Sequence, residues 1–153
     1  MWSAKNCYLC TLRMVIKNIS LVNYKMTLSN LTLSKQDRLS GEIRVKRLFT
    51  EGDSFLLYPL RVVYIHDSLH EMPLQALFSV PKRRFKRANK RNLLKRRMRE
   101  AYRLHRKELS AALENCDFTL SIAFTYIANE PLTFQTIETK MVEALTFLQE
   151  KSQ

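Results

Sequence analysis

The feature that most constrains this chain is a dense block of positive charge between two segments with strand-like patterns. Residues 82–107 hold fourteen Lys or Arg residues and a single acidic residue, Glu100. The whole chain has a net charge of +12, so the residues outside the block carry a net charge of −1 (+12 minus +13). Such a concentration indicates a polyanionic partner, and nucleic acid is favoured over an anionic membrane surface.

From Ala88 onward the block has the period of an amphipathic helix. Like charges four residues apart destabilise an isolated helix by roughly 0.2 to 0.5 kcal/mol per pair, and phosphate binding explains why they are kept. The alternative explanations of this run of cations are a solvated helix face and a transport signal. No helix-turn-helix spacing precedes the helix, so RNA is favoured over DNA. The apolar stripe comprises Leu94, Met98, Ala101, Tyr102, His105 and Leu109, and the cationic sector comprises Arg91, Lys95, Arg96, Arg99, Arg103, Arg106 and Lys107.

Apolar patterns on both sides of the block predict the remaining elements. Their order predicts an α+β fold in which a small sheet packs helices on one face. The expected elements are a helix within 34–51 with Ser40 as N-cap and Gly52 after its end, a strand over 55–65 that includes Pro59, strands over 75–80 and 117–127, and a helix capped by Thr133 that places Phe134, Ile137, Met141, Leu145 and Leu148 on one face.

The chain length of 153 residues suits one domain. Residues 1–30 show no clear period, so we expect them to be an N-terminal extension that is disordered or outside the core, with a single domain over 31–150. The longest apolar run, over 55–65, is far shorter than the roughly 20 residues of a membrane span. An odd number of cysteines without a secretory signal favours the cytoplasm.

No catalytic constellation stands out in the polypeptide. The chain has two glycines in total, which argues against a phosphate-cradling loop, and no Ser/His/Asp arrangement or carboxylate pair is evident. His66 and His70 are four residues apart, but they lie in a predicted loop without an obvious third ligand, and we interpret them as structural. We therefore expect no active site, metal or cofactor on the protein itself.

The strand that ends at Pro81 and the helix that follows carry a specific motif. It reads Phe78-Ser79-Val80-Pro81-Lys82-Arg83, then Ala88, then Arg91-Asn92-x-x-Lys95-Arg96-x-x-Arg99-Glu100-Ala101-Tyr102. Upstream lies Leu33-Ser34-Lys35-x-x-Arg38-Leu39, followed by Phe49 and Gly52. Over roughly residues 31–150 the chain resembles the protein component of bacterial ribonuclease P.

The resemblance implies a fold and a function. The basic helix would belong to a left-handed β-α-β crossover, an exception to the usual hand, in a fold shared with a ribosomal-protein domain. The protein would bind the catalytic RNA and the 5′ leader of precursor tRNA, and would support Mg²⁺-dependent endonucleolytic removal of the leader. The RNA subunit would perform the chemistry and hold the Mg²⁺, and no protein partner would be required.

The resemblance also assigns site residues. Phe49 and Arg38 match the leader-binding cleft, where an aromatic ring stacks on a base. Many members carry another aromatic where this chain has Val45, so weaker stacking is expected. The alternative function is a structural RNA-binding protein of a ribosome or an assembly particle, which would not need a cleft beside Phe49. The residues assigned to RNA binding are Lys82, Arg83, Arg91, Asn92, Lys95, Arg96 and Arg99.

Overall fold

A computed structural model describes residues 33–67, 73–113, 116 and 118–152. Residues 31–153 form one unit, and the expected extension over 1–30 lies outside the described residues. In chain order the elements are α2 (Glu42–Glu51), β1 (Asp53–Leu57), β2 (Leu60–Asp67), β3 (Leu74–Ser79), α3 (Ala88–Leu113), β4 (Thr119–Tyr126) and α4 (Phe134–Lys151).

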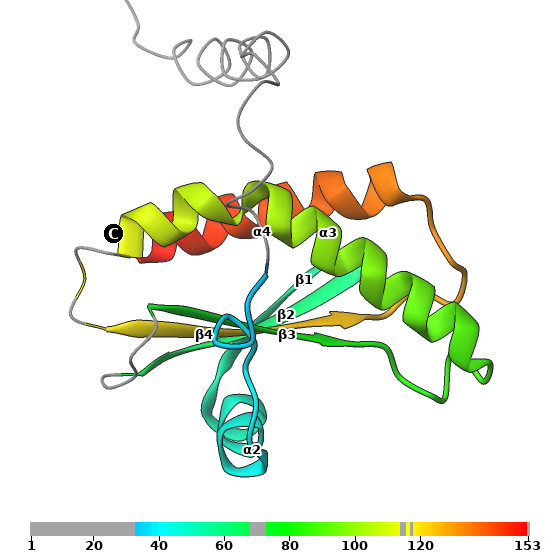
Figure 1. Cartoon of the computed structure of the whole chain (residues 1–153), viewed down its shortest axis with the longest axis horizontal. Helices are drawn as coiled ribbons and strands as arrows, with labels where there is room; N and C mark the ends of the chain where they lie inside the picture. Colours follow the sequence, from blue (N-terminus) through cyan, green and yellow to red (C-terminus); the bar gives the residue numbers. More distant parts are fainter. Residues whose placement is uncertain (1–32, 68–72, 114–115, 117, 153) are drawn as a thin grey trace, which may run out of the picture. The chain divides into compact units, whose positions relative to one another are not determined.

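The four strands form one mixed sheet in the order β1-β2-β4-β3 (Figure 1). β1 pairs with β2 and β2 pairs with β4 in antiparallel fashion, whereas β3 and β4 are parallel neighbours. Parallel neighbours need a long connection, and α3 is that connection. The unit β3-α3-β4 is therefore the β-α-β crossover that carries the basic helix.

The apolar run over 55–65 forms a hairpin, so the prediction of a single strand there is wrong. β1 ends at Leu57, β2 begins at Leu60, and the cis peptide bond between Tyr58 and Pro59 lies in the turn. Proline has no N–H to donate to a strand ladder, which is why the chain turns at Pro59 instead of continuing.

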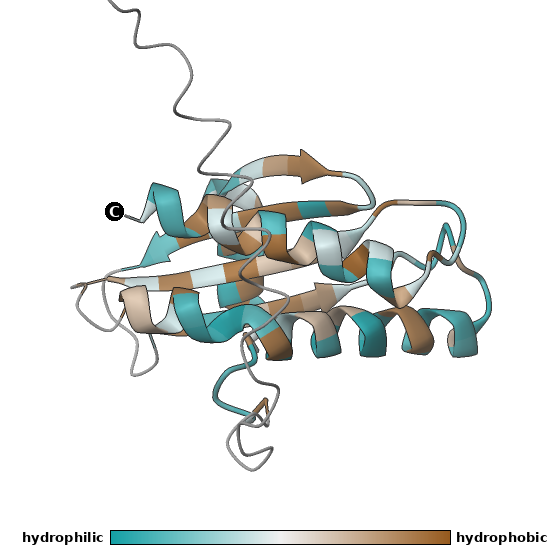
Figure 2. Ribbon diagram, turned by 90° about the horizontal axis from the view of Figure 1, so that it is seen from above, coloured by the Kyte–Doolittle hydropathy of each residue, from teal (hydrophilic) through white to brown (hydrophobic). Residues whose placement is uncertain are grey.

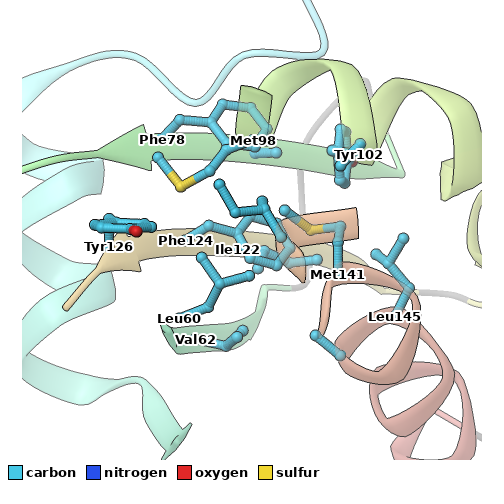
Figure 3. Close-up of a cluster of buried hydrophobic side chains, with 14 of the residues drawn as sticks. Leu60, Val62, Phe78, Met98, Tyr102, Ile122, Phe124, Tyr126, Met141 and Leu145 are labelled. Atoms are coloured by element: carbon cyan, nitrogen blue, oxygen red, sulfur yellow. The ribbon is translucent and has the colours of Figure 1, made fainter. Parts of the chain in front are cut away.

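The main core lies between the sheet and the helices α3 and α4, which cover the same face (Figure 1). The 3.6-residue period of both helices is confirmed, because the predicted stripe residues other than His105 and Phe134 are buried. Burying each such side chain contributes about 1.5 to 3 kcal/mol. Figure 3 shows the centre of this core, which includes Leu60, Val62, Phe78, Met98, Tyr102, Ile122, Phe124, Tyr126, Met141 and Leu145.

The opposite face of the sheet is partly covered by α2, so the expectation of helices on one face needs a correction (Figure 1). Leu48 of α2 is fully buried against Val63 of β2 and Ala123 of β4. These strand residues alternate with those of the main core and would otherwise face water. The short helix of ten residues covers this second apolar patch.

The ends of α2 and α4 show which capping predictions were right. Gly41 occupies the N-cap of α2 with a φ of 99°, so the prediction of Ser40 as N-cap is wrong. Gly52 ends α2 as predicted, in close contact with backbone that leaves no room for a Cβ atom. Thr133 caps α4 as predicted, because its hydroxyl accepts a hydrogen bond from the N–H of Thr136 at 3.3 Å.

The segment before α2 lies along the outer edge of β3. The N–H of Leu39 donates to the carbonyl of Ala76 at 3.1 Å, and the N–H of Ala76 donates to the carbonyl of Asp37 at 2.9 Å. An ion pair of 3.0 Å between Asp37 and Arg106 ties the same segment to α3. The segment therefore covers a strand edge that would otherwise be open to pairing.

Hydrophilic and hydrophobic residues alternate along the helices, so each helix rests on the sheet through one side only (Figure 2). Among the described residues, no helix is long and apolar enough to cross a membrane.

Candidate nucleic-acid interface

The cations of the basic block fall into two groups according to what they contact. Five arginines bind acceptors within the protein, and we call them the anchored arginines: Arg84, Arg91, Arg97, Arg103 and Arg106. The other nine have no hydrogen bond or ion pair with any described residue, and we call them the free cations: Lys82, Arg83, Lys86, Arg87, Lys90, Lys95, Arg96, Arg99 and Lys107.

Two anchored arginines shape the loop over 81–87, between β3 and α3. Nη1 of Arg91 donates to the carbonyl oxygens of Phe85 and Lys86, at 2.8 Å and 2.7 Å. Nη1 of Arg84 donates to Oδ1 of Asn129 at 2.6 Å. The ring of Phe85 is buried in the main core beside Tyr126. The loop is therefore held at several points.

Fixing the loop in this way presents its charges to solvent. Lys82, Arg83, Lys86 and Arg87 are all exposed. These side chains lose less conformational freedom on binding than those of a flexible tail would, because the backbone that carries them is already fixed. The basic segment is thus a preformed surface.

The one acidic residue of the block does not neutralise the free cations. Glu100 pairs with Arg103, whose Nε lies 2.9 Å from Oε2. This hydrogen bond lowers the pKa of Glu100 and outweighs its partial burial, which acts to raise it. Glu100 is therefore charged at neutral pH and already paired, while Arg96 and Arg99 on the same helix have no acidic partner among the described residues.

An open hollow lies over α3 and the first residue of α4, and we call it the α3 hollow. Its volume is about 640 Å³, which is in the range of sites that hold small ligands. Leu33 and Phe134 line it with apolar surface. The remaining lining residues are charged: Arg38, Arg96, Arg97, Arg99, Glu100 and Arg103.

The structure brings some of the predicted site residues together and separates others. Asn92 and Arg96 are exposed on α3, and Lys95 and Arg99 are partly exposed. Arg38 joins Arg96 and Arg99 in the α3 hollow.

The two residues assigned to the leader cleft lie on different surfaces. Phe49 belongs to α2 on the opposite face of the sheet from α3, and its side chain is 49% exposed. Arg38, in contrast, lines the α3 hollow and donates to the carbonyl of Leu33 at 3.3 Å. The expected pairing of Phe49 with Arg38 in one cleft is therefore not what the structure shows.

The sheet continues beyond α2 as an uncovered row with one residue per strand. The strand register pairs Ser79 with Thr125, Thr125 with Arg61, and Arg61 with Leu56. Ser79, Thr125 and Arg61 each lie two positions along their strand from a residue that belongs to the apolar patch under α2. Leu56 pairs with Arg61, so all four residues share the face of the sheet that α2 partly covers. We call Ser79, Thr125, Arg61 and Leu56 the open row.

Phe49 lies on the side of α2 that faces the open row. Arg47 binds the carboxylate of Asp67, at the end of β2 far from Arg61, with Nη1 to Oδ2 at 3.1 Å. Two helical residues later the side chain is rotated by about 200°, so Phe49 lies on the other side of the helix from Arg47. An exposed aromatic ring therefore borders a sheet surface with polar and apolar groups.

Comparison with known proteins settles the family. The family model described as Ribonuclease P matches residues 33–148, which is most of the chain. The chain belongs to the ribonuclease P protein family. The ribonuclease P protein component of Porphyromonas gingivalis is 42% identical over 114 residues, covering 74% of this chain and 83% of the relative. That of Chlorobaculum tepidum is 36% identical over 96 residues, covering 58% and 62%.

Solved structures support the same fold. The ribonuclease P protein of Staphylococcus aureus superposes with a TM-score of 0.60 at 18% sequence identity, covering 73% of this chain and 94% of that chain. A mutant of the same protein gives a TM-score of 0.60 at 19% identity, covering 75% and 90%. The predicted α+β fold of the ribonuclease P protein type is confirmed.

Membership of the ribonuclease P protein family confirms the predicted function over the alternative of a purely structural RNA binder. The chain is a protein component of an endoribonuclease holoenzyme and associates with the ribonuclease P RNA. The family binds RNA and takes part in processing the 5′ leader of tRNA.

Sequence reasoning missed the anchored arginines and the α3 hollow. The acceptors of Arg91 and Arg97 are backbone carbonyls, which have no sequence signature. Leu33 and Phe134 are far apart in the chain, and no pattern relates them. One signal was available: Phe85 is the only apolar residue between Lys82 and Arg87, which is typical of a loop anchored in a core.

The histidine pair considered in the sequence does not form a described site. His66 is exposed near the end of β2, with its ring against Phe118 at a centroid distance of 4.9 Å, and His70 lies outside the described residues. No three His, Cys, Asp or Glu side chains within the described ranges lie close enough together to hold a metal ion.

Proposed function

We propose that this protein grips the ribonuclease P RNA through the free cations of α3 and of the loop over 81–87, while the RNA subunit cleaves the precursor tRNA. The observation that carries the proposal is the division of the basic block. Nine cations are left without acid partners among the described residues, on backbone that the anchored arginines and the main core hold in place.

The spacing of the free cations suits a phosphate backbone. Neighbours three or four residues apart on a helix lie about 5 to 6 Å apart at their Cβ atoms, and Lys95 and Arg96 each form such a pair with Arg99 on α3. Guanidinium groups bind phosphate oxygens through two parallel hydrogen bonds, which adds geometric selectivity. Neutralising several phosphates in this way releases counterions and makes affinity strongly salt-dependent.

The proposal places the single-stranded 5′ leader of precursor tRNA on the surface beside α2. The ring of Phe49 is available for a base, and such stacking contributes about 1 to 3 kcal/mol per base. Arg61 in the open row is exposed and adds a cation. Val45 of α2 is partly buried against the second apolar patch and supplies no second ring, so one stacked base is expected.

The Mg²⁺ required by the reaction is assigned to the RNA. Mg²⁺ prefers oxygen ligands in octahedral geometry, and the phosphate oxygens of an RNA supply such ligands. The protein contributes positioning and charge neutralisation. The proposal includes a cytoplasmic location.

Reconstitution tests this function. The full-length protein is added to a bacterial ribonuclease P RNA at a Mg²⁺ concentration at which the RNA alone is nearly inactive. We expect cleavage of precursor tRNA at the mature 5′ end only when both components are present. Cleavage by the protein alone would place the active site on the polypeptide, and no stimulation of the RNA would contradict the proposed role.

A further inference from the structure

The α3 hollow combines cationic and apolar lining residues. Arg96 and Arg99 are cationic, and neither guanidinium has a hydrogen-bond acceptor within the described part of the chain. Leu33 and Phe134 are apolar and are packed against the main core. We propose, on the basis of the proposed RNA-binding function, that this hollow seats one unpaired nucleotide of an RNA, with its base on Phe134 and its phosphate at the arginines.

The charge of the hollow favours an anion. Five arginines and one glutamate line it, and the glutamate is already paired with Arg103. Arg97 and Arg38 donate to the carbonyls of Leu132 and Leu33, whereas Arg96 and Arg99 have no acceptor among the described residues and are available to a phosphate. Arginine forks bind phosphate oxygens better than point charges do, because they donate two parallel hydrogen bonds.

The apolar lining residues, Leu33 and Phe134, distinguish this site from a general phosphate contact. A surface that bound only backbone phosphates would need cations alone. Phe134 is partly buried at the start of α4, where the cap made by Thr133 fixes the backbone. Unpaired RNA bases stack on such aromatic side chains, whereas bases inside an RNA helix are not available to them.

The volume of the hollow is consistent with a ligand larger than a single anion. At about 640 Å³ it is in the range of sites that hold small organic ligands. The nucleotide could come from the catalytic RNA or from the precursor tRNA, and both present the same phosphate and base.

A binding experiment with two probes tests the site. The full-length protein carrying Phe49→Ala, which removes the ring proposed to stack on the leader, is titrated with a single-stranded ribonucleotide pentamer and with an abasic pentamer that has the same phosphates. We expect the base-bearing pentamer to bind at least about fivefold more tightly. Phe134→Leu is expected to abolish this preference, because leucine keeps apolar packing but loses the ring, while Phe134→Tyr is expected to retain it.

Phe147→Leu is the matched control. Phe147 lies on the same helix, is also partly buried, and packs against Phe55 at a centroid distance of 4.5 Å, far along α4 from the hollow. This variant should keep the preference for the base-bearing pentamer. Equal binding of both pentamers by the Phe49→Ala protein, or a preference that survives the further change Phe134→Leu in it, would mean that the hollow is a cationic surface without a base site.

Base-specific chemical probing of the assembled holoenzyme distinguishes the sources and separates this proposal from the proposed function. In complexes with Phe134→Leu, we expect one nucleotide to become more reactive than with the native protein, either in the catalytic RNA or in the precursor tRNA. No change in either RNA, in complexes that still cleave, would overturn the nucleotide seat and leave the proposed function intact. Failure of the native protein to stimulate cleavage would instead contradict the proposed function.

Discussion

Arg91 lies near the start of α3, and its guanidinium binds the loop over 81–87 that precedes this helix. Nη1 donates to the carbonyls of Phe85 and Lys86, which leaves three of the five guanidinium N–H donors for an outside ligand. The assignment of Arg91 to RNA binding stays a prediction. Its contacts show that it also holds the cationic loop in shape.

We expect Arg91→Ala to lower the free energy of unfolding by about 1 to 2 kcal/mol, because two loop carbonyls lose a charged donor. Arg96→Ala should change it by less than about 0.5 kcal/mol, because Arg96 has no partner to lose among the described residues. Urea denaturation of both variants measures the difference. Equal stability would show that the loop does not depend on Arg91.

Phe49 and Leu48 are neighbours on α2 with opposite environments, 49% and 0% exposed. We expect Phe49→Ala to weaken binding of precursor tRNA by the holoenzyme more than binding of mature tRNA, by roughly five- to tenfold, because only the precursor has a leader to stack on the ring. Equilibrium binding of the two RNAs measures this selectivity.

Leu48→Ala is the control for that prediction. Truncating a fully buried leucine costs about 2 to 5 kcal/mol of stability, whereas Phe49→Ala should cost much less. Equal weakening of both RNAs by Phe49→Ala would show that Phe49 has only a packing role.

Among the elements, the segment over 33–39 is tied to α3 by the carboxylate of Asp37. Burial acts to raise the pKa of Asp37, but the hydrogen bond from Arg106 and those with Ser34 outweigh it, so the pKa lies below its usual value of 3.8. A depressed pKa in the folded state gives stability that is present above the unfolded pKa and is lost as the pH falls through the folded one.

We therefore expect Asp37→Asn to lower the free energy of unfolding by about 1 to 2 kcal/mol at pH 7, because the partly buried pair with Arg106 is lost. The difference from the native protein should shrink as the pH falls from about 4 through the lower pKa of the folded state, where the native carboxylate becomes protonated too. Denaturation curves across this pH range test it. Glu143→Gln, which breaks an exposed pair with Lys140, should have little effect at any pH.

The junction of α2 and β1 tolerates only glycine. A Cβ atom at position 52 would lie 2.3 Å from the carbonyl oxygen of Leu48 and 2.9 Å from that of Tyr64. We expect Gly52→Ala to lower the free energy of unfolding by about 1 to 3 kcal/mol, since backbone must move to admit the methyl group. Ser54→Ala, at an exposed position nearby, serves as the control in the same thermal or urea unfolding measurement, and a similar loss in both would contradict the steric explanation.

The elements show what the amino-acid pattern specifies and what it leaves open. The stripe of Leu94, Met98 and Tyr102 predicted α3 correctly, because a helix that packs on one side must repeat its apolar residues every 3.6 positions. The same kind of pattern in α2 could not show which face of the sheet it covers. That choice depends on Val63 and Ala123, whose alternation with the main core appears only once the strands are paired.

For the molecule as a whole, the sequence predicted the chemistry of the site better than its geometry. A net charge of +13 in 26 consecutive residues predicts a polyanion without any knowledge of the fold. The separation of anchored arginines from free cations depends on long-range contacts such as that between Arg84 and Asn129. The placement of Phe49 and Arg38 on different surfaces depends on the chain passing over the edge of β3.

On the scale of the whole molecule, the two surfaces of the proposed function lie on opposite faces of one sheet. In the proposed function, α3 and its loop face the catalytic RNA, and the open row with Phe49 faces the leader. A thin fold of this kind can hold two RNA segments at a fixed separation, because the sheet and its two cores are closely packed and resist deformation.

The most direct test of the central claim is the salt dependence of binding to the ribonuclease P RNA. We predict that the double variant Arg96→Ala, Arg99→Ala shows a slope of log affinity against log salt concentration that is shallower than that of the native protein by about 1.4 to 1.8, corresponding to two lost phosphate contacts. An unchanged slope in a folded double variant would contradict the claim that the free cations of α3 bind the RNA backbone.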